Sequence, residues 1–151
     1  GDLWVDWWIP AGDPRYDPDP RAAAARAGGW WAHALAPRVA GAVTVADGAY
    51  EPGPGRGVAC FSGVGPGEVL VDGRKAVGVT QWRVREGTLL STLLPATSTL
   101  EVVDLLASPP AGLADALDHA TLPELGLDDS AALVSDLAGS GPWSLDRLAL
   151  S

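Results

Sequence analysis

The sequence predicts an α+β fold in which helices pack against a small, mostly antiparallel sheet. Short segments rich in apolar and β-branched residues follow one another closely between residues 58 and 94, and Asp72-Gly73, a dipeptide that tight two-residue turns prefer, separates two of them. A capped helix is expected before this region, and apolar residues recur at helical spacing after it. The 151 residues contain no run of about 18 consecutive apolar residues, so we expect a single domain, residues 1–151, without a transmembrane helix.

The N-terminal elements are a strand and a capped helix. Asp2–Ile9 is rich in aromatic and β-branched residues, which favour strands. A proline-rich segment follows, and Asp19 then has the position of an N-cap, with Pro20 as the first helical residue. We therefore expect a helix from Pro20 to about Leu35.

The rest of the chain divides into a meander of strands and a helical end. Strands are expected at Val43–Val45, Val58–Ser62, Glu68–Val71, Arg74–Arg83 and Thr88–Leu94. After Pro95 the apolar spacing becomes helical and predicts three helices, at about residues 100–106, at Ala111–His119 and at Asp128–Leu137. Residues 98–151 are therefore expected to form the helical C-terminal part of the same domain.

The charge and the cysteine content limit the partners and the compartment. Nineteen acidic and ten basic residues give a net charge of −9. Such a surface repels phosphate backbones and anionic lipids, so we expect neither a nucleic-acid partner nor a membrane partner. Cys60 is the single cysteine, so no internal disulfide can form, and a reducing compartment, the cytoplasm, is the simpler expectation.

Lys75 is the one lysine beside nine arginines, and one residue, Arg74, separates it from the predicted hairpin turn. Two interpretations are open: a solvated lysine at a strand end, or an ammonium group held beside developing negative charge, such as an acyl carbonyl or a phosphate. Gly78 favours the second interpretation, because a glycine inside a strand often marks the close approach of a ligand or of another backbone.

Residues 73–81, with the sequence GRKAVGVTQ, resemble the segment GRK-hydrophobic-x-G-x-x-Q of the biotin/lipoate protein ligase superfamily, and the lipoate–protein ligase and octanoyltransferase branch most closely. The resemblance implies the class II synthetase-like fold of these ligases. It also implies that Lys75 contacts the acyl carbonyl or the acyl-adenylate. The substrate-binding residues that it implies are Gly73, Gly78, Val79, Thr80, Ser91 and Thr92.

Cys60 is the second candidate catalytic residue. As part of an apolar strand it would be an inert, small hydrophobic side chain. However, Ala59-Cys60-Phe61 resembles an ACF element that precedes GRK in one octanoyltransferase subgroup, where the thiolate takes the acyl group as a thioester and passes it to a lysine of a carrier domain. A thiolate is a strong nucleophile that a neighbouring cation favours, and Lys75 is such a cation if the hairpin folds back.

This sequence departs from the pattern of the family at two sequence motifs. The RRxGGG loop of the family would lie before residue 1, so we expect an N-terminally truncated segment whose first strand lies inside a larger sheet and which does not catalyse by itself. Where many members carry an HG pair, this chain has Leu90-Ser91-Thr92, which offers only hydroxyl groups.

The expected function is therefore that of a lipoate–protein ligase family acyltransferase, which attaches a lipoyl or octanoyl group to a lysine of a lipoyl-carrier domain. A ligase would activate lipoate or octanoate with ATP and Mg²⁺ through an acyl-adenylate. A transferase would take the group from octanoyl-acyl carrier protein onto Cys60. The alternative is a non-catalytic relative that binds an acyl chain or a carrier domain.

No tightly bound cofactor and no metal site are expected. His33 and His119 are far apart in the sequence, with no cysteine or acidic residue at metal-ligand spacing.

Overall fold

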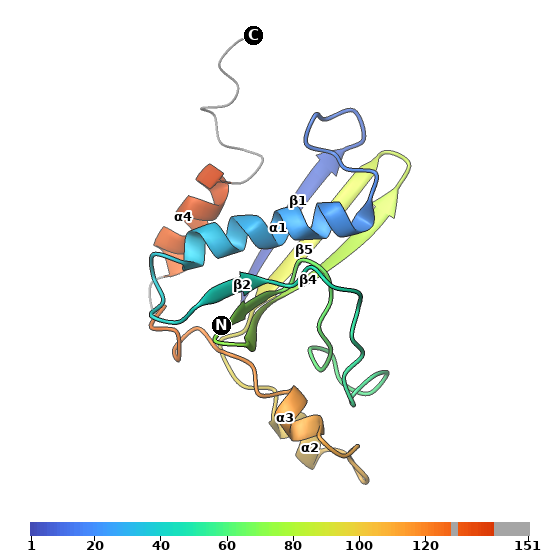
Figure 1. Ribbon diagram of the computed structural model, residues 1–151, viewed down its shortest axis with the longest axis vertical. Helices are drawn as coiled ribbons and strands as arrows, with labels where there is room; N and C mark the ends of the chain where they lie inside the picture. Colours follow the sequence, from blue (N-terminus) through green and yellow to red (C-terminus); the bar gives the residue numbers. More distant parts are fainter. Residues whose placement is uncertain (128–129, 141–151) are drawn as a thin grey trace.

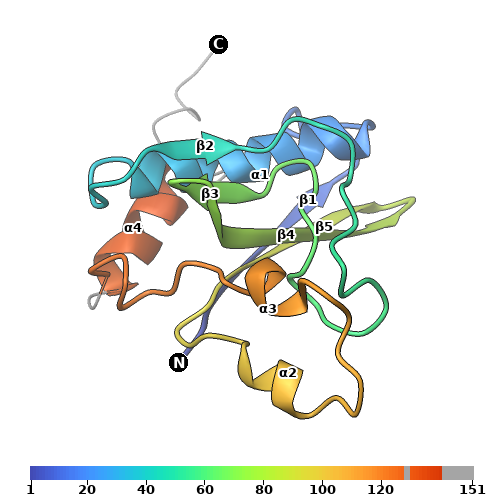
Figure 2. The same ribbon diagram turned by 60° about the horizontal axis from the view of Figure 1, so that its bottom comes forward.

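The computed structural model describes residues 1–127 and 130–140, which form one five-stranded antiparallel sheet with helices on both of its sides. The strand order is β1-β5-β4-β3-β2, where the strands are β1 (Leu3–Pro10), β2 (Val43–Val45), β3 (Val69–Val71), β4 (Arg74–Val84) and β5 (Gly87–Leu94). Helix α1 (Pro20–Leu35) crosses one face of the sheet (Figure 1). The segment that carries α2 (Glu101–Asp104) and α3 (Leu113–Ala116) lies on the other side (Figure 2), and α4 (Ser130–Ser140) packs beside α1.

The α+β class and the antiparallel sheet are thus confirmed. Strand β1 pairs along its whole length with β5 and is an edge strand of the sheet that the described residues form. The finer expectation, the fold of the biotin/lipoate ligases, stays a prediction.

Helix α1 begins and ends where its sequence predicts. The Asp19 carboxylate accepts a hydrogen bond from the backbone N–H of Arg21 at 2.9 Å, and Pro20 occupies the first turn. Gly28 lies in the middle of the helix, where glycine lowers helix stability. Its role is a close approach, because a Cβ atom there would collide with the carbonyl group of Gly67. The glycine therefore lets α1 lie directly on the loop that leads into β3.

Two helices in the C-terminal part are shorter than predicted. Helix α2 covers four residues, and Leu105, one of the apolar residues whose helical spacing predicted a longer helix, follows it and is 82 % exposed. Helix α3 also covers four residues, because Gly112 adopts φ +77°, which a continuous helix from Ala111 cannot contain. Residues 98–127 are therefore mostly irregular around these two short helices.

The third predicted helix, Asp128–Leu137, corresponds to α4, which begins at Ser130 and continues to Ser140. Residues 128–129 and 141–151 lie outside the described residues. No helix within the described part is long and apolar enough to cross a membrane.

The predicted strand at Val58–Ser62 is also wrong. The backbone N–H groups of Val58 and Ala59 both donate to the carbonyl of Gly55, so this segment forms local turns and pairs with no strand of the sheet. Phe61 has a φ of +76°, which no regular strand contains. Glycine and proline residues on both sides make such turns accessible.

The sheet face opposite α1 exposes indole rings. Side chains alternate along a strand, so Trp8 and Trp82 lie on the face away from the buried Trp7. Both stand in register with Leu89 on β5, so the three side chains form one row across the sheet.

A chain of hydrogen bonds ties α1 to two strands. The indole Nε1 of Trp31 donates to the hydroxyl oxygen of Thr92 at 2.8 Å, and this hydroxyl donates to the carbonyl of Val5 at 2.8 Å. Both side chains are buried. Thr92, one of the expected substrate-binding residues, is therefore engaged in contacts that hold the fold together.

Substitution Thr92→Val is expected to lower the free energy of unfolding by about 1–3 kcal/mol, because it leaves the buried indole N–H of Trp31 without an acceptor. Denaturant unfolding measures this change. Thr44→Val, on an exposed position of β2, is the control and should change the stability by no more than about 0.5 kcal/mol. Equal losses in the two variants would contradict the structural role of Thr92.

Candidate active site

Lys75 lies at the start of β4, where a β-bulge changes the direction of the side chains. Leu70 pairs with Lys75 while Val69 pairs with Val77, so Ala76 is an extra residue in β4. A bulge of this kind interrupts the alternation of faces and redirects a side chain. The Lys75 side chain is only 9 % exposed and points into the segment 61–68.

Among residues 1–127 and 130–140, three contacts with the ammonium group of Lys75 stand out, all from that segment. Its Nζ lies 2.7 Å from Oε1 of Glu68 and donates to the carbonyl of Gly63 at 2.9 Å. It also lies 4.2 Å from the centroid of the Phe61 ring. The second oxygen of Glu68 accepts a hydrogen bond from the backbone N–H of Gly65 at 2.9 Å. The site is thus a buried ion pair enclosed by one loop.

Burial lowers the pKa of Lys75 from its usual value, because an ammonium group out of water loses its hydration. The Glu68 carboxylate opposes this shift by charge attraction and by its hydrogen bond, and the negative charge of a Cys60 thiolate opposes it more weakly. The lysine therefore releases its proton more readily than a lysine in water, while Glu68 favours the charged form.

Cys60 is exposed and lies on the turn directly before Phe61. The ring of Phe61 lies 4.2 Å from the Lys75 ammonium group, so the turn that carries the thiol contacts the lysine. The two expected catalytic residues therefore lie on a loop and on a strand, instead of on two strands, and the loop contacts the strand through Phe61.

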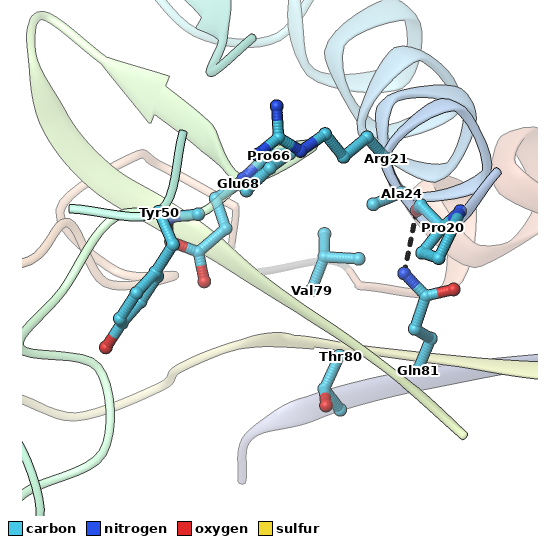
Figure 3. A pocket seen from close by; sticks show the side chains of 10 residues that line it. Pro20, Arg21, Ala24, Tyr50, Pro66, Glu68, Val79, Thr80 and Gln81 are labelled. Carbon is cyan, nitrogen blue, oxygen red and sulfur yellow. Dashed lines mark hydrogen bonds between the residues drawn. The ribbon is translucent and has the colours of Figure 1, made fainter. Parts of the chain in front are cut away.

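A pocket of about 350 Å³ lies next to this site, between the start of α1 and β4 (Figure 3). Val79 and Thr80, two of the expected substrate-binding residues, are on its β4 side. Gln81, farther along β4, donates to the carbonyl of Pro20 at 2.7 Å. The complete lining consists of Pro20, Arg21, Ala24, Tyr50, Gly65, Pro66, Glu68, Val79, Thr80 and Gln81. Glu68 thus belongs both to the pocket and to the ion pair with Lys75.

The other expected substrate-binding residues do not line this pocket. Gly73 has a φ of +81° and, with Asp72 at +50°, forms the two-residue turn between β3 and β4. Gly78 is covered by the Phe61 ring. Ser91 lies opposite Asp6 and Thr80 on neighbouring strands, half-buried.

Glu68 and Phe61 are the two site residues that the sequence reasoning missed. Register could have indicated Glu68: counting back from the Asp72-Gly73 turn puts Leu70 opposite Lys75, so Glu68 is the diagonal neighbour, within reach of a long side chain. No comparable signal points to Phe61, because its contact with Gly78 depends on a loop conformation.

No cluster of three or more His, Cys, Asp or Glu side chains that could hold a metal ion occurs among residues 1–127 and 130–140. Comparisons with known proteins leave the family open, since no protein-family model and no characterised protein matches this chain. The family resemblance, which covers roughly Leu3 to Leu137, thus depends on the sequence pattern, and on residues 59–61 and 73–81 above all.

Proposed function

We propose that this protein transfers an acyl group, lipoyl or octanoyl, to a lysine of a lipoyl-carrier domain. One observation carries the proposal: the single thiol of the chain is exposed on the turn whose next residue, Phe61, contacts the ammonium group of the single lysine, which is buried and paired with Glu68. A nucleophile beside a fixed positive charge is the arrangement that acyl transfer needs, because negative charge develops on the carbonyl oxygen.

In the transferase route, Cys60 Sγ attacks the carbonyl carbon of octanoyl-acyl carrier protein. The carrier's thiol leaves with the proton that Cys60 releases, and Cys60 holds the acyl group as a thioester. The amine of the acceptor lysine then attacks this thioester, an amide forms, and the surplus proton returns to the Cys60 thiolate. Lys75 uses two of its three N–H donors on Glu68 and Gly63, which leaves the third for the acyl oxygen.

The pocket beside Glu68 supports the proposal as a place for the acyl chain. Ala24, Pro66 and Val79 give it apolar walls, and Thr80 is the hydroxyl-bearing residue among its β4 residues. In the ligase route, the same site would take lipoate or octanoate with ATP and Mg²⁺ as co-substrates. Dependence on a free thiol fits a reducing compartment such as the cytoplasm.

A non-catalytic carrier-binding or acyl-binding relative is the second candidate. It is favoured by the enclosure of Lys75, whose ammonium group already has a carboxylate, a carbonyl and an aromatic ring around it.

Incubation of the full-length protein with octanoyl-acyl carrier protein is expected to produce an octanoyl adduct on Cys60, detectable by intact-mass and peptide mass spectrometry. The adduct should be absent in Cys60→Ser and should disappear when an apo carrier domain is added. Full ATP-dependent activity of Cys60→Ser would overturn the thioester route and retain the ligase route. Absence of both the adduct and ATP-dependent lipoylation would favour the non-catalytic candidate.

A further inference from the structure

We propose that Phe61 is a positioning residue that holds the turn containing Cys60 against Lys75. The absence of a side chain at Gly78 leaves the space that the Phe61 ring occupies. The inference takes the roles of Cys60 and Lys75 from the proposed function. Phe61 holds the loop that carries the thiol against the strand that carries the ammonium group.

The fit between Phe61 and Gly78 is close. A Cβ atom at position 78 would lie 2.5 Å from Cε2, 3.1 Å from Cζ and 3.4 Å from Cδ2 of the Phe61 ring. Carbon atoms do not approach to 2.5 Å without bonding, so any side chain at this position displaces the ring. The glycine inside β4 is therefore explained by the approach of a side chain of the same protein.

The ring is held on two further sides. The buried His119, which follows α3, meets it edge-on, with ring centroids 5.1 Å apart and an interplanar angle of 62°. The Lys75 ammonium group lies over the ring at 4.2 Å from its centroid, the geometry of a cation–π contact. Phe61 thus joins the loop to β4 and to the segment after α3.

The backbone of Phe61 requires such anchoring. Its φ of +76° is a conformation that a bulky residue rarely adopts and that persists only when surrounding contacts compensate for it. Cys60 precedes it directly and is itself exposed. The position of the thiol therefore depends on the ring of the next residue.

The chain offers two unique probes for this arrangement, since Lys75 is the one lysine and Cys60 the one cysteine of its 151 residues. Protein labelled with [ε-¹³C]lysine gives one lysine side-chain signal. The Phe61 ring should shift the attached protons upfield, because they are next to the ammonium nitrogen that lies over its face. A short thiol-to-amine cross-linker, with products mapped by peptide mass spectrometry, reports how often Cys60 and Lys75 come close.

Phe61→Ala and Gly78→Ala should each abolish the upfield shift. Each should also lower the Cys60–Lys75 cross-link yield at least about threefold, the factor that loss of a cation–π contact implies. Because Gly78→Ala acts by displacing the ring, adding it to Phe61→Ala should change the yield by less than about twofold. Val58→Ala, which truncates an exposed apolar side chain in the same turn, is the matched control and should leave both readouts unchanged.

Phe61→Leu keeps an apolar side chain in the space above Gly78. It is the variant to use if Phe61→Ala does not fold. It should lose the upfield shift while the melting temperature stays near that of the wild type. An unshifted lysine signal in the wild-type protein, or independent losses from Gly78→Ala and Phe61→Ala that multiply in the double variant, would overturn the proposal. Neither readout requires acyl transfer, so failure of the proposed function and failure of this inference are separately visible.

Discussion

Replacing Lys75 by alanine in the full-length protein is expected to lower kcat/KM for acyl transfer about 10²–10³-fold, the usual effect of removing one group that stabilises developing negative charge. The surroundings of Lys75 explain why no other group compensates for the loss of its positive charge. The described residues within contact of the ammonium group are a carboxylate, a carbonyl and an aromatic ring, and none of them carries positive charge.

Lys75→Arg should not restore the activity, although it keeps the charge. The ammonium group is a compact point charge between Glu68 and Gly63, and a planar guanidinium with five donors cannot occupy the same place. Steady-state rates with a carrier domain as acceptor measure the effect, at a temperature at which every variant is folded.

Arg85→Ala is the matched control, because it removes a cation that is 94 % exposed at the end of the β4–β5 hairpin. Its kcat/KM should equal that of the wild type. Acyl transfer by Lys75→Ala at the wild-type rate would show that the lysine serves the fold and not the reaction.

Glu68→Gln is expected to produce the largest loss of stability, about 3–5 kcal/mol, because removal of one partner leaves the other charge buried and unpaired. The Lys75 and Glu68 side chains are 9 % and 10 % exposed, so water cannot replace the lost carboxylate without a rearrangement of the loop. Chemical denaturation at pH 7 measures the change in the free energy of unfolding.

This loss should shrink as the pH rises. Burial holds the pKa of Lys75 in the folded protein below its usual value. Between that lowered pKa and the unfolded value of about 10.4, the unfolded chain therefore binds more protons than the folded one. Stability rises with pH in this window. Without Glu68 the folded pKa of Lys75 falls further, and the window begins at a lower pH. The variant therefore regains stability relative to the wild type as the pH rises toward the pKa of the unfolded lysine.

Glu86→Gln is the control, since Glu86 forms only a surface pair with Arg85 that is worth about 0–1 kcal/mol. It should show neither the large loss nor its pH dependence. A Glu68→Gln variant whose deficit stays constant up to pH 10 would mean that Lys75 does not titrate against Glu68 in the folded protein.

Local sequence signals were sufficient for several elements. Asp19 and Pro20 set the start of α1 because capping depends only on neighbouring residues. Asp72-Gly73 set the β3–β4 turn because a glycine accepts the positive φ that this turn requires. Alternation and β-branched residues placed β4 and β5 to within one residue.

The wrong predictions, the strand at residues 58–62 and the longer helix around α2, share one cause. The segment 58–62 has the composition of a strand, yet it lies over β4, where Phe61 covers Gly78, and not along an edge of the sheet, so its backbone groups bond locally. The apolar residues around α2 have helical spacing, but Leu105 finds nothing to pack against. Propensity describes a residue and its neighbours, whereas pairing and burial depend on segments far away in the chain.

The sequence by itself determined the α+β class, the turn at Asp72-Gly73 and the choice of Lys75 as a candidate residue, since each depends on local patterns or on a short resemblance. Only the tertiary structure decided that Glu68 pairs with Lys75 and that Phe61 fills the space above Gly78. The reason is physical: a β-bulge redirects one side chain and a positive φ redirects another, and such conformations are selected by the contacts they make possible and not by the residues that adopt them.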